Sequence, residues 1–341
     1  MIRKKAIIFG VTGQDGYYLT KLLLKKNYIV HGIKRRSSSV PTNRISSFLN
    51  QKNFKIHYGD LTDTSSIYNI IKIVKPDEIY NLAAQSHVGV SFYTPIFTAN
   101  VNAIGVLAIL EAIRTIKKEI KFYQAGTSEM FGKTKEKFQS EETVFNPQSP
   151  YGAAKVFAHQ ITKNYRDAYK IFASNGILFN HESPFRGDNF VTKKIVDSLT
   201  NIKIGKQKKL VLGNLYAKRD WGHAADYVEA IHKILQQKKP DDFVIATGRE
   251  CTIKEFVNKT AKIIGLKIKW KGKDLNEIAV DEKGKTIISI DKKYFRPLEV
   301  DYLKGDATKA KRILKWRSKT TLEDLIKEMV LHESKELSQR S

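Results

Sequence analysis

The sequence predicts an α/β protein with a Rossmann-type, doubly wound parallel sheet and a smaller mixed α/β lobe that binds a substrate. Short apolar runs alternate with segments of helical periodicity through the first half of the chain, which is typical of strands joined by crossover helices. A glycine-rich turn follows the first apolar run, and hydroxyl and carboxyl side chains follow a later one. These positions fit a parallel sheet, because such sheets bind ligands beyond the carboxyl ends of their strands.

The periodic segments place the individual elements. The apolar runs predict strands at 5–9, 29–33, 54–58, 78–82, 121–124 and 172–178. Helical periodicity predicts helices at 17–26, 65–74, 95–116, 151–169, 191–204, 224–236, 253–264, 307–314 and 322–332. The lysine- and acid-rich stretch 271–285 predicts an exposed excursion between two short strands. We expect a Rossmann domain of residues 1–180 plus about 223–250, and a substrate-binding domain of about 181–222 plus 251–341.

Composition argues against several classes of protein. Cys251 is the one cysteine, so the chain has no internal disulfide, and its histidines show no zinc-site spacing; we expect no metal. The apolar run at 6–9 is too short for a signal sequence, so we expect a cytoplasmic protein with no membrane partner. The formal net charge of +25 comes mainly from lysines dispersed over predicted helix faces, which argues against a nucleic-acid-binding stripe.

A glycine-rich turn directly after the first predicted strand indicates a dinucleotide site. Its spacing is Gly-x-x-Gly-x-x-Gly, and it opens the first predicted helix. A pyrophosphate needs backbone amides at a helix start and no Cβ atoms in its path. A tight turn without a ligand is the alternative, and the place of the turn after a strand argues against it. The residues expected to bind the cofactor are Gly10, Thr12, Gly13, Gln14, Asp15 and Gly16.

The residues after the second predicted strand indicate which dinucleotide binds. NAD-binding folds carry an acidic residue there for the ribose 2′-hydroxyl, whereas this chain has Arg35, Arg36, Ser37 and Ser38. Two guanidinium groups and two hydroxyls suit a 2′-phosphate, so the expected cofactor is NADP, and a basic turn without a ligand is the alternative. After the fourth strand, the cofactor is expected to cross the sheet edge beside Leu82, Ala83, Ala84, Gln85 and Ser86.

The fifth predicted strand and the helix from residue 151 carry the catalytic candidates. Tyr151 and Lys155 share one helical face, so the ammonium is expected to lower the pKa of the phenol and make it a usable base. Other Tyr-x-x-x-Lys matches occur in the chain, but this one follows a Pro-Tyr helix start. The preceding strand ends in Thr127, Ser128 and Glu129, and Glu129 supplies a second proton acceptor. Strand-end caps and an ordinary first-turn acid are the alternatives for this triplet.

These motifs and several further blocks resemble the GDP-mannose 4,6-dehydratase family of extended short-chain dehydrogenases/reductases. Sugar-nucleotide epimerases share only the glycines and the Tyr/Lys pair, and dTDP-glucose 4,6-dehydratases carry Asp-Glu where this chain has Ser128-Glu129. The blocks run in order over almost the whole length: Gly-Val-Thr-Gly-Gln-Asp-Gly from Gly10, His-Gly-Ile-Lys-Arg-Arg-Ser-Ser from His31, His-Tyr-Gly-Asp-Leu-Thr-Asp from His57, Asn-Leu-Ala-Ala-Gln-Ser-His-Val from Asn81, Asn-Gly-Ile-Leu-Phe-Asn-His-Glu-Ser-Pro from Asn175, Arg-Asp-Trp-Gly-His-Ala from Arg219 and Tyr-Phe-Arg-Pro from Tyr294.

The resemblance implies an NADP-dependent hydro-lyase that acts on a GDP-sugar. In the implied mechanism, Tyr151, assisted by Lys155 and Thr127, removes the proton of the C4 hydroxyl while hydride leaves C4 for NADP. Glu129 takes the C5 proton and helps to expel the C6 hydroxyl as water, and hydride then returns to C6. The implied product is GDP-4-keto-6-deoxy-D-mannose, and the cofactor is regenerated in each cycle.

The resemblance also carries over further binding residues. His181 and Arg186 match positions at the nicotinamide and 2′-phosphate ends of the cofactor, with a merely packed histidine as the alternative for His181. Asp60 and Leu61 match the adenine contact. For the substrate, two arginines would clamp the diphosphate and a glutamate would bind guanine, with surface ion pairs as the alternative. The implied substrate contacts are Ser86, Ser91, Thr127, Glu129, Asn180, Lys194, Arg219, Arg296 and Glu299.

The chain departs from the family pattern at a few positions. Gly126 stands where serine is usual, Phe97 where tyrosine is common and Lys193 where arginine is frequent. We read Gly126 as the loss of a hydroxyl near the reacting sugar, which opens an alternative substrate. That alternative is GDP-D-glycero-D-manno-heptose, which would give GDP-6-deoxy-4-keto-heptose by the same chemistry.

Partners and rival functions follow from the same observations. By resemblance, the protein is a homotetramer in which residues 35–44 approach the cofactor of a neighbouring subunit. If the protein were a noncatalytic NADP-binding regulator, we would expect some of the Tyr/Lys/Glu set to be lost. If it bound nucleic acid, we would expect a concentrated basic patch with interleaved aromatic residues. The sequence shows neither feature, so an enzyme is the expected function.

Overall fold

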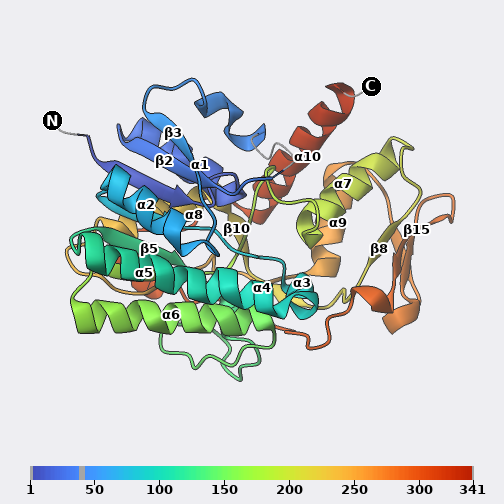
Figure 1. Cartoon of the computed structure of the whole chain (residues 1–341). Helices are drawn as coiled ribbons and strands as arrows, with labels where there is room; N and C mark the ends of the chain where they lie inside the picture. The colour runs from blue at the N-terminus through green and yellow to red at the C-terminus, as the bar shows by residue number, and fades with distance from the viewer. Residues whose placement is uncertain (1–2, 38–42, 340–341) are drawn as a thin grey trace.

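The computed structural model describes residues 3–37 and 43–339, and a seven-stranded parallel sheet forms its centre (Figure 1). The strand order is β11-β6-β5-β4-β1-β2-β3, which confirms the predicted doubly wound Rossmann arrangement and adds β11 at one edge. The strands are β1 (Lys5–Phe9), β2 (Ile29–Lys34), β3 (Phe54–Tyr58), β4 (Glu78–Asn81), β5 (Lys121–Ala125), β6 (Ala173–Leu178) and β11 (Phe243–Ile245).

Both faces of this sheet are apolar and covered by helices. In β1, Ala6 and Ile8 point into one core, whereas Ile7 and Phe9 point into the core on the other face. Burial on both faces explains why the strands read as nearly continuous apolar runs. Two helices cover the first core, and three cover the second, where α5 and α6 run side by side in Figure 1. The first two are α1 (Gln14–Lys25) and α8 (Ala224–Leu235), and the other three are α2 (Thr64–Val74), α5 (Gly105–Ile116) and α6 (Pro150–Tyr169).

Helix α6, which carries two catalytic candidates, begins at a well-defined cap. The Ser149 hydroxyl accepts a hydrogen bond from the Gly152 amide at 3.0 Å, and Pro150 occupies the first turn, where a missing amide hydrogen costs little. Tyr151 and Lys155 follow directly, and both side chains are buried. The cap thus fixes the start of the helix and the direction in which both side chains leave it.

An apolar helical segment at 95–116 has the length and composition of a membrane span, but most of it is buried within the fold. It consists of α4 (Pro95–Ala99), a π-helical turn (Asn100–Ile104) and α5. In this turn the Asn102 side chain accepts a hydrogen bond from the Gln85 amide and donates one to the Gln85 carbonyl oxygen, each at 2.9 Å. The segment therefore supports the loop that follows β4.

The smaller lobe packs helices against a four-stranded mixed sheet at the side of the Rossmann sheet (Figure 1). Its strands are β8 (Leu210–Leu212), β13 (Lys269–Lys271), β14 (Ile278–Val280) and β15 (Thr286–Ile290), and its helices are α7 (Val191–Lys203), α9 (Ile253–Ile263) and α10 (Leu322–Gln339). Two short strand pairs complete the fold: β7 (Asn180–Glu182) with β10 (Trp221–His223), and β9 (Lys218–Arg219) with β12 (Cys251–Thr252).

The stretch 271–285 differs from the prediction of an exposed excursion. It contains β14, which lies between β13 and β15 in the four-stranded sheet, and Ala279 and Val280 are buried. The strand has only three residues, and charged residues surround it in the sequence. Its apolar signal is too short to distinguish it from a loop.

The chain returns to the Rossmann part before its last helix. The prediction of a helix at 307–314 corresponds to a π-helical turn, Ala310–Leu314, preceded by a short helical stretch. Leu314 and Trp316 belong to the core beneath α8, and Trp316 Nε1 donates to the Asp226 carbonyl oxygen at 2.8 Å. The two-domain division remains a proposal, and this segment of the second domain packs into the first.

Asp242 joins α6 to the edge of the Rossmann sheet through buried polar contacts. Its carboxylate accepts two hydrogen bonds from Arg166, each at 2.9 Å, and one from the Asn175 amide at 3.0 Å. We expect Asp242→Ala to lower the free energy of unfolding by about 3–5 kcal/mol in urea denaturation, because a largely buried guanidinium loses its two-bond partner and keeps only Asp167, at 3.8 Å. Glu282→Ala removes an exposed ion pair with Lys267 and should cost less than about 1 kcal/mol. Equal losses in the two variants would contradict this account.

Candidate active site

The register of the parallel strands brings three loops together at one edge of the sheet. Phe9 of β1 pairs with Asn81 of β4, and Asn81 pairs with Gln124 of β5. The glycine turn, the loop after β4 and the triplet after β5 therefore leave the sheet side by side. This is the edge at which doubly wound sheets bind their ligands.

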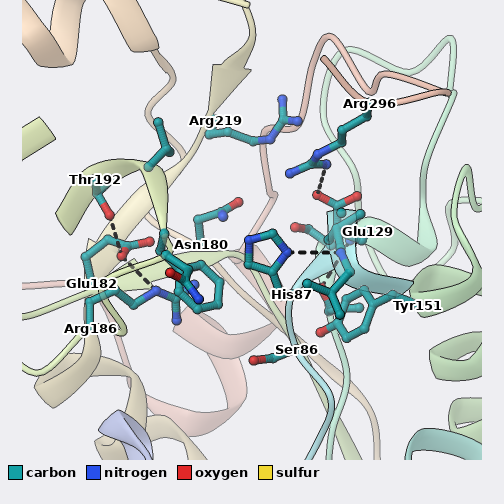
Figure 2. Close-up of a pocket in the computed structure, with 18 of the residues that line it drawn as sticks. Ser86, His87, Glu129, Tyr151, Asn180, Glu182, Arg186, Thr192, Arg219 and Arg296 are labelled. Carbon is teal, nitrogen blue, oxygen red and sulfur yellow. Dashed lines mark hydrogen bonds and ion pairs between the residues drawn. The ribbon is translucent and has the colours of Figure 1, made fainter. Parts of the chain in front are cut away.

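These three loops and the smaller lobe enclose a cavity of about 970 Å³. Figure 2 shows Glu129 and Tyr151 on one side, Glu182 and Arg186 on the other, and His87 between them. The volume is at the upper end of the range for small-molecule sites, about 300–1,000 Å³. The predicted site residues that line the cavity are Gly10, Gly13, Gln14, Asp15, Gly16, Leu82, Ala84, Ser86, Thr127, Ser128, Glu129, Tyr151, Lys155, Asn180, His181, Arg186, Lys194, Arg219, Arg296 and Glu299.

The glycine turn has the shape that a dinucleotide pyrophosphate requires. Gly10 has a φ angle of +80°, and a Cβ there would lie 2.8 Å from the Ala83 nitrogen. A Cβ at Gly16 would lie 2.4 Å from the Gly10 carbonyl oxygen. Neither position accepts a side chain, so the backbone stays open to the cavity at the start of α1, where amides and the helix dipole favour an anion. The residues present therefore fit a dinucleotide.

His181 is tied to the start of α1. Its Nε2 atom lies 2.8 Å from Asp15 Oδ2, its Nδ1 atom lies 2.8 Å from the Phe179 carbonyl oxygen, and its ring stacks on Tyr227. Burial opposes the charged imidazolium, but the Asp15 carboxylate outweighs burial and raises the pKa of His181. His181 is thus an ion-paired histidine, and it holds β7 against the glycine turn.

Tyr151 and Lys155 lie together as expected, but their ionisation differs from the prediction. The Lys155 ammonium donates to the Ala125 carbonyl oxygen at 2.9 Å and lies 5.9 Å from the centre of the Tyr151 ring. Burial raises the pKa of Tyr151 to about 12, although a hydrogen bond with Thr127 lowers it. Burial also lowers the pKa of Lys155 to about 8. The expected lowering of the phenol's pKa is wrong, because burial is the dominant cause and raises it.

The triplet after β5 combines a structural role with a chemical one. The Thr127 hydroxyl accepts a hydrogen bond from the Glu129 amide at 3.3 Å and caps the 3-10 turn Ser128–Met130. The structural alternative for Thr127 therefore holds, and the same cap places Glu129 on the cavity wall. Glu129 Oε1 accepts a hydrogen bond from Arg296 Nη1 at 3.2 Å (Figure 2). The buried carboxylate thus has a cationic partner from the smaller lobe.

Polar side chains of the smaller lobe line another part of the cavity. Arg219 is buried, and its Nη2 atom lies 3.6 Å from Glu299 Oε1. Lys194 donates to the Val211 carbonyl oxygen at 2.7 Å. Asn180 Oδ1 is buried without a hydrogen-bond partner in the part of the chain that the structure describes. Such an atom on a cavity wall is suited to a ligand, because buried polar groups are normally paired.

Several predicted residues do not line the cavity. Ser91 is fully buried, and its hydroxyl donates to the Val88 carbonyl oxygen at 2.6 Å. Leu61 belongs to the core of the sheet, and the Asp60 carboxylate accepts a hydrogen bond from the Thr62 hydroxyl at 2.8 Å. The other such residues are Thr12, Arg35, Arg36, Ser37, Ala83 and Gln85, and Ser38 lies outside the described residues. Binding roles for this group stay predictions.

Sequence reasoning overlooks several ionisable side chains on the cavity wall, among them His87 and Glu182. The His87 ring accepts the Val90 amide at 3.1 Å and so caps the short helix that follows, and burial lowers its pKa. Glu182 accepts a hydrogen bond from the Thr192 hydroxyl at 2.7 Å and lies 3.0 Å from Arg186 Nε, and burial raises its pKa. Both residues stand inside blocks that carry the resemblance and directly beside predicted binding residues, which is the signal that marks them.

Gly126 lines the cavity and also packs closely on the neighbouring strand. A Cβ at this position would lie 2.9 Å from the Gly176 carbonyl oxygen and 3.1 Å from Met130 Cε. The glycine therefore has a packing reason of its own. The inference from Gly126 to an altered sugar stays a prediction.

Comparison with known proteins establishes the family. A family model described as GDP-mannose 4,6 dehydratase matches residues 7–329. The chain belongs to the GDP-mannose 4,6-dehydratase family. It is 52% identical to GDP-mannose 4,6 dehydratase of Homo sapiens over 337 residues, which cover 96% of this chain and 91% of that protein. It is also 52% identical to GDP-mannose 4,6-dehydratase of Sinorhizobium fredii, with 96% of each chain covered. The protein is therefore an enzyme of the hydro-lyase class.

Solved structures of more distant proteins share the fold. The dTDP-glucose 4,6-dehydratase of Bacillus anthracis, solved in complex with NAD, superimposes with a TM-score of 0.81 at 24% identity over 98% of both chains. The UDP-glucose 4-epimerase of Thermotoga maritima gives a TM-score of 0.82 at 23% identity, over 98% of this chain and 99% of that one. These similarities support the extended short-chain dehydrogenase/reductase architecture.

The buried Lys155 allows a test of the site's electrostatics. Because burial lowers its pKa from 10.5 to about 8, folding disfavours the protonated lysine below pH 8. This lowers the free energy of unfolding by about 3 kcal/mol. The loss becomes smaller as the pH rises from 8 to 10.5, because in this range the lysine is protonated in the unfolded chain but not in the folded one. We expect Lys155→Met to raise the free energy of unfolding by about 1–2 kcal/mol at pH 7 in urea denaturation, and by less at pH 10.

An exposed lysine supplies the control for this prediction. Lys72 lies on the solvent side of α2, so Lys72→Met should change the free energy of unfolding by less than about 0.5 kcal/mol. A Lys155→Met protein that is less stable than the wild type at pH 7 would show that burial of the lysine does not destabilise the fold.

Proposed function

We propose that this enzyme catalyses the NADP-dependent 4,6-dehydration of GDP-D-mannose to GDP-4-keto-6-deoxy-D-mannose. The observation that carries the proposal is a single cavity in which the glycine turn meets Thr127, Glu129, Tyr151 and Lys155. A dinucleotide site beside two proton-transfer groups is what an internal redox step followed by elimination requires. The names of relatives with 52% identity support GDP-mannose as the substrate.

The first step uses side chains from α6 and the end of β5. The phenolate oxygen of Tyr151 takes the proton of the C4 hydroxyl and becomes the neutral phenol, and the Thr127 hydroxyl hydrogen-bonds to the same oxygen. Lys155 is held beside the ring by the Ala125 carbonyl oxygen. Bound NADP would supply the acceptor for the C4 hydride and its donor to C6, and would add a positive charge when oxidised. Burial raises the pKa of the phenol, so positive charge beside Tyr151 is needed to favour the phenolate.

The second step belongs to Glu129. The C4 ketone acidifies the neighbouring C5 hydrogen, and the Glu129 carboxylate takes it as a proton. The electron pair of the C5–H bond forms the C5=C6 double bond, and the C6–O bond breaks. The leaving oxygen receives a proton from Glu129 and departs as water. Reduction at C6 and protonation at C5 then give the saturated 4-keto-6-deoxy sugar.

The nucleotide part of the substrate is assigned to the smaller lobe. Arg219 and Arg296 clamp the diphosphate, and Glu299 accepts hydrogen bonds from guanine N1 and N2. Lys194 adds a cation to the same wall. The unpaired, buried Asn180 Oδ1 supports this assignment, because it needs a donor that a sugar hydroxyl can supply.

NADP is the proposed cofactor because of the residues after β2. Arg35 and Arg36 follow this strand directly, and both are exposed. Between β2 and Ser37 the described chain contains no acidic residue that would bind an unmodified ribose. Two free guanidinium groups at this place suit a 2′-phosphate.

The alternative substrate is GDP-D-glycero-D-manno-heptose. It rests on Gly126, which lines the cavity. The names of the relatives favour GDP-D-mannose, so the heptose is the comparison in its test.

We further propose a cytoplasmic homotetramer in which residues 35–44 approach the cofactor of a neighbouring subunit. Arg44, at the end of that segment, donates to the carbonyl oxygens of Thr12 and Phe185, which places its guanidinium against the glycine turn of its own subunit. Exposed apolar side chains also suit subunit contacts. They occur in the segment after β4 and on α6: Val90, Tyr93, Ile96, Phe97, Ile104 and Phe157.

A direct assay compares the two sugars. We expect purified enzyme with NADP to convert GDP-D-mannose to a 4-keto product, followed by mass spectrometry, at least about tenfold faster than the heptose derivative in kcat/KM. Tyr151→Phe should bind NADP normally but lose at least about 100-fold in kcat, because it lacks the group that takes the C4 proton. Faster turnover of the heptose would overturn the substrate assignment, and retained activity in Tyr151→Phe would overturn the mechanism.

The two arginines after β2 allow a test of cofactor choice. We expect the double variant Arg35→Ala, Arg36→Ala to weaken NADP binding by about 10- to 100-fold, because it loses charge-assisted bonds to the 2′-phosphate, and to leave NAD binding nearly unchanged. Fluorescence titration of both cofactors measures this difference. Equal losses for NADP and NAD would mean that the arginines do not recognise the phosphate.

A further inference from the structure

One hydrogen bond joins the arginine assigned to the diphosphate with the carboxylate assigned to elimination. Arg296 Nη1 donates to Glu129 Oε1 at 3.2 Å, and the two side chains face one another in Figure 2. The Glu129 side chain is 9% exposed, and that of Arg296 is 29% exposed. Glu129 is thus held through its backbone by Thr127 and through its carboxylate by Arg296.

The segment that carries Arg296 is itself anchored at the cavity. The Tyr294 carbonyl oxygen packs so closely on Gly213 that a Cβ there would lie 2.7 Å away. The Lys194 ammonium lies 3.9 Å from the centre of the Tyr294 ring. These contacts place the guanidinium of Arg296 beside Glu129 from a fixed backbone.

The neighbouring Arg219 provides a contrast. Its guanidinium pairs with Glu299 at 3.6 Å and donates to the Lys218 carbonyl oxygen at 2.9 Å, and among the described residues it makes no hydrogen bond or ion pair with Glu129. Both arginines line the same cavity and are assigned to the same diphosphate. They differ in that only one of them bonds directly to the carboxylate that performs the chemistry.

We propose that Arg296 is a positioning residue for Glu129, which couples recognition of the diphosphate to elimination of water. This inference rests on the proposed function. A guanidinium has five N–H donors in a planar fork, so Arg296 can hold Glu129 with one and offer others to phosphate oxygens. Diphosphate binding then fixes the guanidinium from its other side and, through it, the carboxylate.

The two chemical steps depend differently on this coupling. Elimination moves the C5 proton to Glu129, turns the C5–H electron pair into the C5=C6 bond, and releases the C6 oxygen as water with a proton from Glu129. A carboxylate that rotates freely loses rate in this step, because small misplacements of a catalytic group are costly. Oxidation at C4 uses Tyr151 and needs no oriented Glu129.

Rapid mixing of the NADP-loaded enzyme with GDP-D-mannose separates these steps, because reduced cofactor absorbs at 340 nm. Arg296→Lys keeps a positive charge for the diphosphate, but it lacks the planar guanidinium that can donate hydrogen bonds to two anions at once. We expect its kcat to fall about 10- to 100-fold and reduced cofactor to accumulate, since C4 oxidation continues while elimination slows. Glu129→Gln gives the reference signal for blocked elimination.

Arg219→Lys is the matched control, because it alters a diphosphate contact without touching Glu129. We expect it to raise KM and to weaken GDP binding in calorimetry, without accumulation of reduced cofactor. Thermal unfolding of each variant shows whether the fold is intact, and Arg296→Gln replaces Arg296→Lys if the latter is unfolded.

The outcomes separate this inference from the proposed function. Accumulation of reduced cofactor in both the Arg296 and Glu129 variants supports the coupling. A folded Arg296 variant that changes only KM, with no added absorbance at 340 nm, overturns it and leaves the function intact. A wild-type enzyme that forms neither reduced cofactor nor keto sugar from GDP-D-mannose overturns the function itself.

Discussion

The site depends on one close approach of two backbones, where Gly10 meets the loop after β4. A Cβ at Gly10 would lie 2.8 Å from the Ala83 nitrogen, so no other residue permits β1 and β4 to end this close together. Asn102 holds the far side of the same loop through two bonds to the Gln85 backbone. The loop is thus fixed between the glycine turn and the core helix, and Ser86 and His87 face the cavity as a result.

The sequence predicts the sheet and much of the cavity wall because these features have local signals. Buried parallel strands read as apolar runs, and the glycine spacing and the Pro-Tyr helix start are tied to backbone geometry. The three-residue strand β14 has no such signal, because its pattern is shorter than one helical turn. Its burial follows from pairing with β15, which only the folded structure supplies.

The ionisation of Tyr151 is not predictable from its spacing to Lys155. Helical spacing brings the two side chains together, but the pKa depends on how much water the fold removes around them. Both groups are buried, and burial shifts each toward its neutral form. The direction of the Cβ at Gly126 is hidden from the sequence for a similar reason, since it depends on the contact with Gly176 on the neighbouring strand.

A cavity that must hold phosphate groups needs cations, and buried cations are costly unless they are paired. The structure meets both demands by pairing four carboxylates on the wall with a basic side chain. Two of these pairs also join the Rossmann part to the smaller lobe, because their carboxylates follow β1 and β5 and their basic partners lie beyond residue 180. The pairs are Asp15 with His181, Glu129 with Arg296, Glu182 with Arg186, and Glu299 with Arg219.

The same cations are suited to phosphate oxygens. A ligand that binds them therefore also affects how the carboxylates are oriented. Tyr151 and Lys155 stand apart from these pairs. Burial thus shifts this pair toward its neutral forms, whereas a counter-ion orients Glu129, and the proposed oxidation at C4 and elimination across C5 and C6 divide between them.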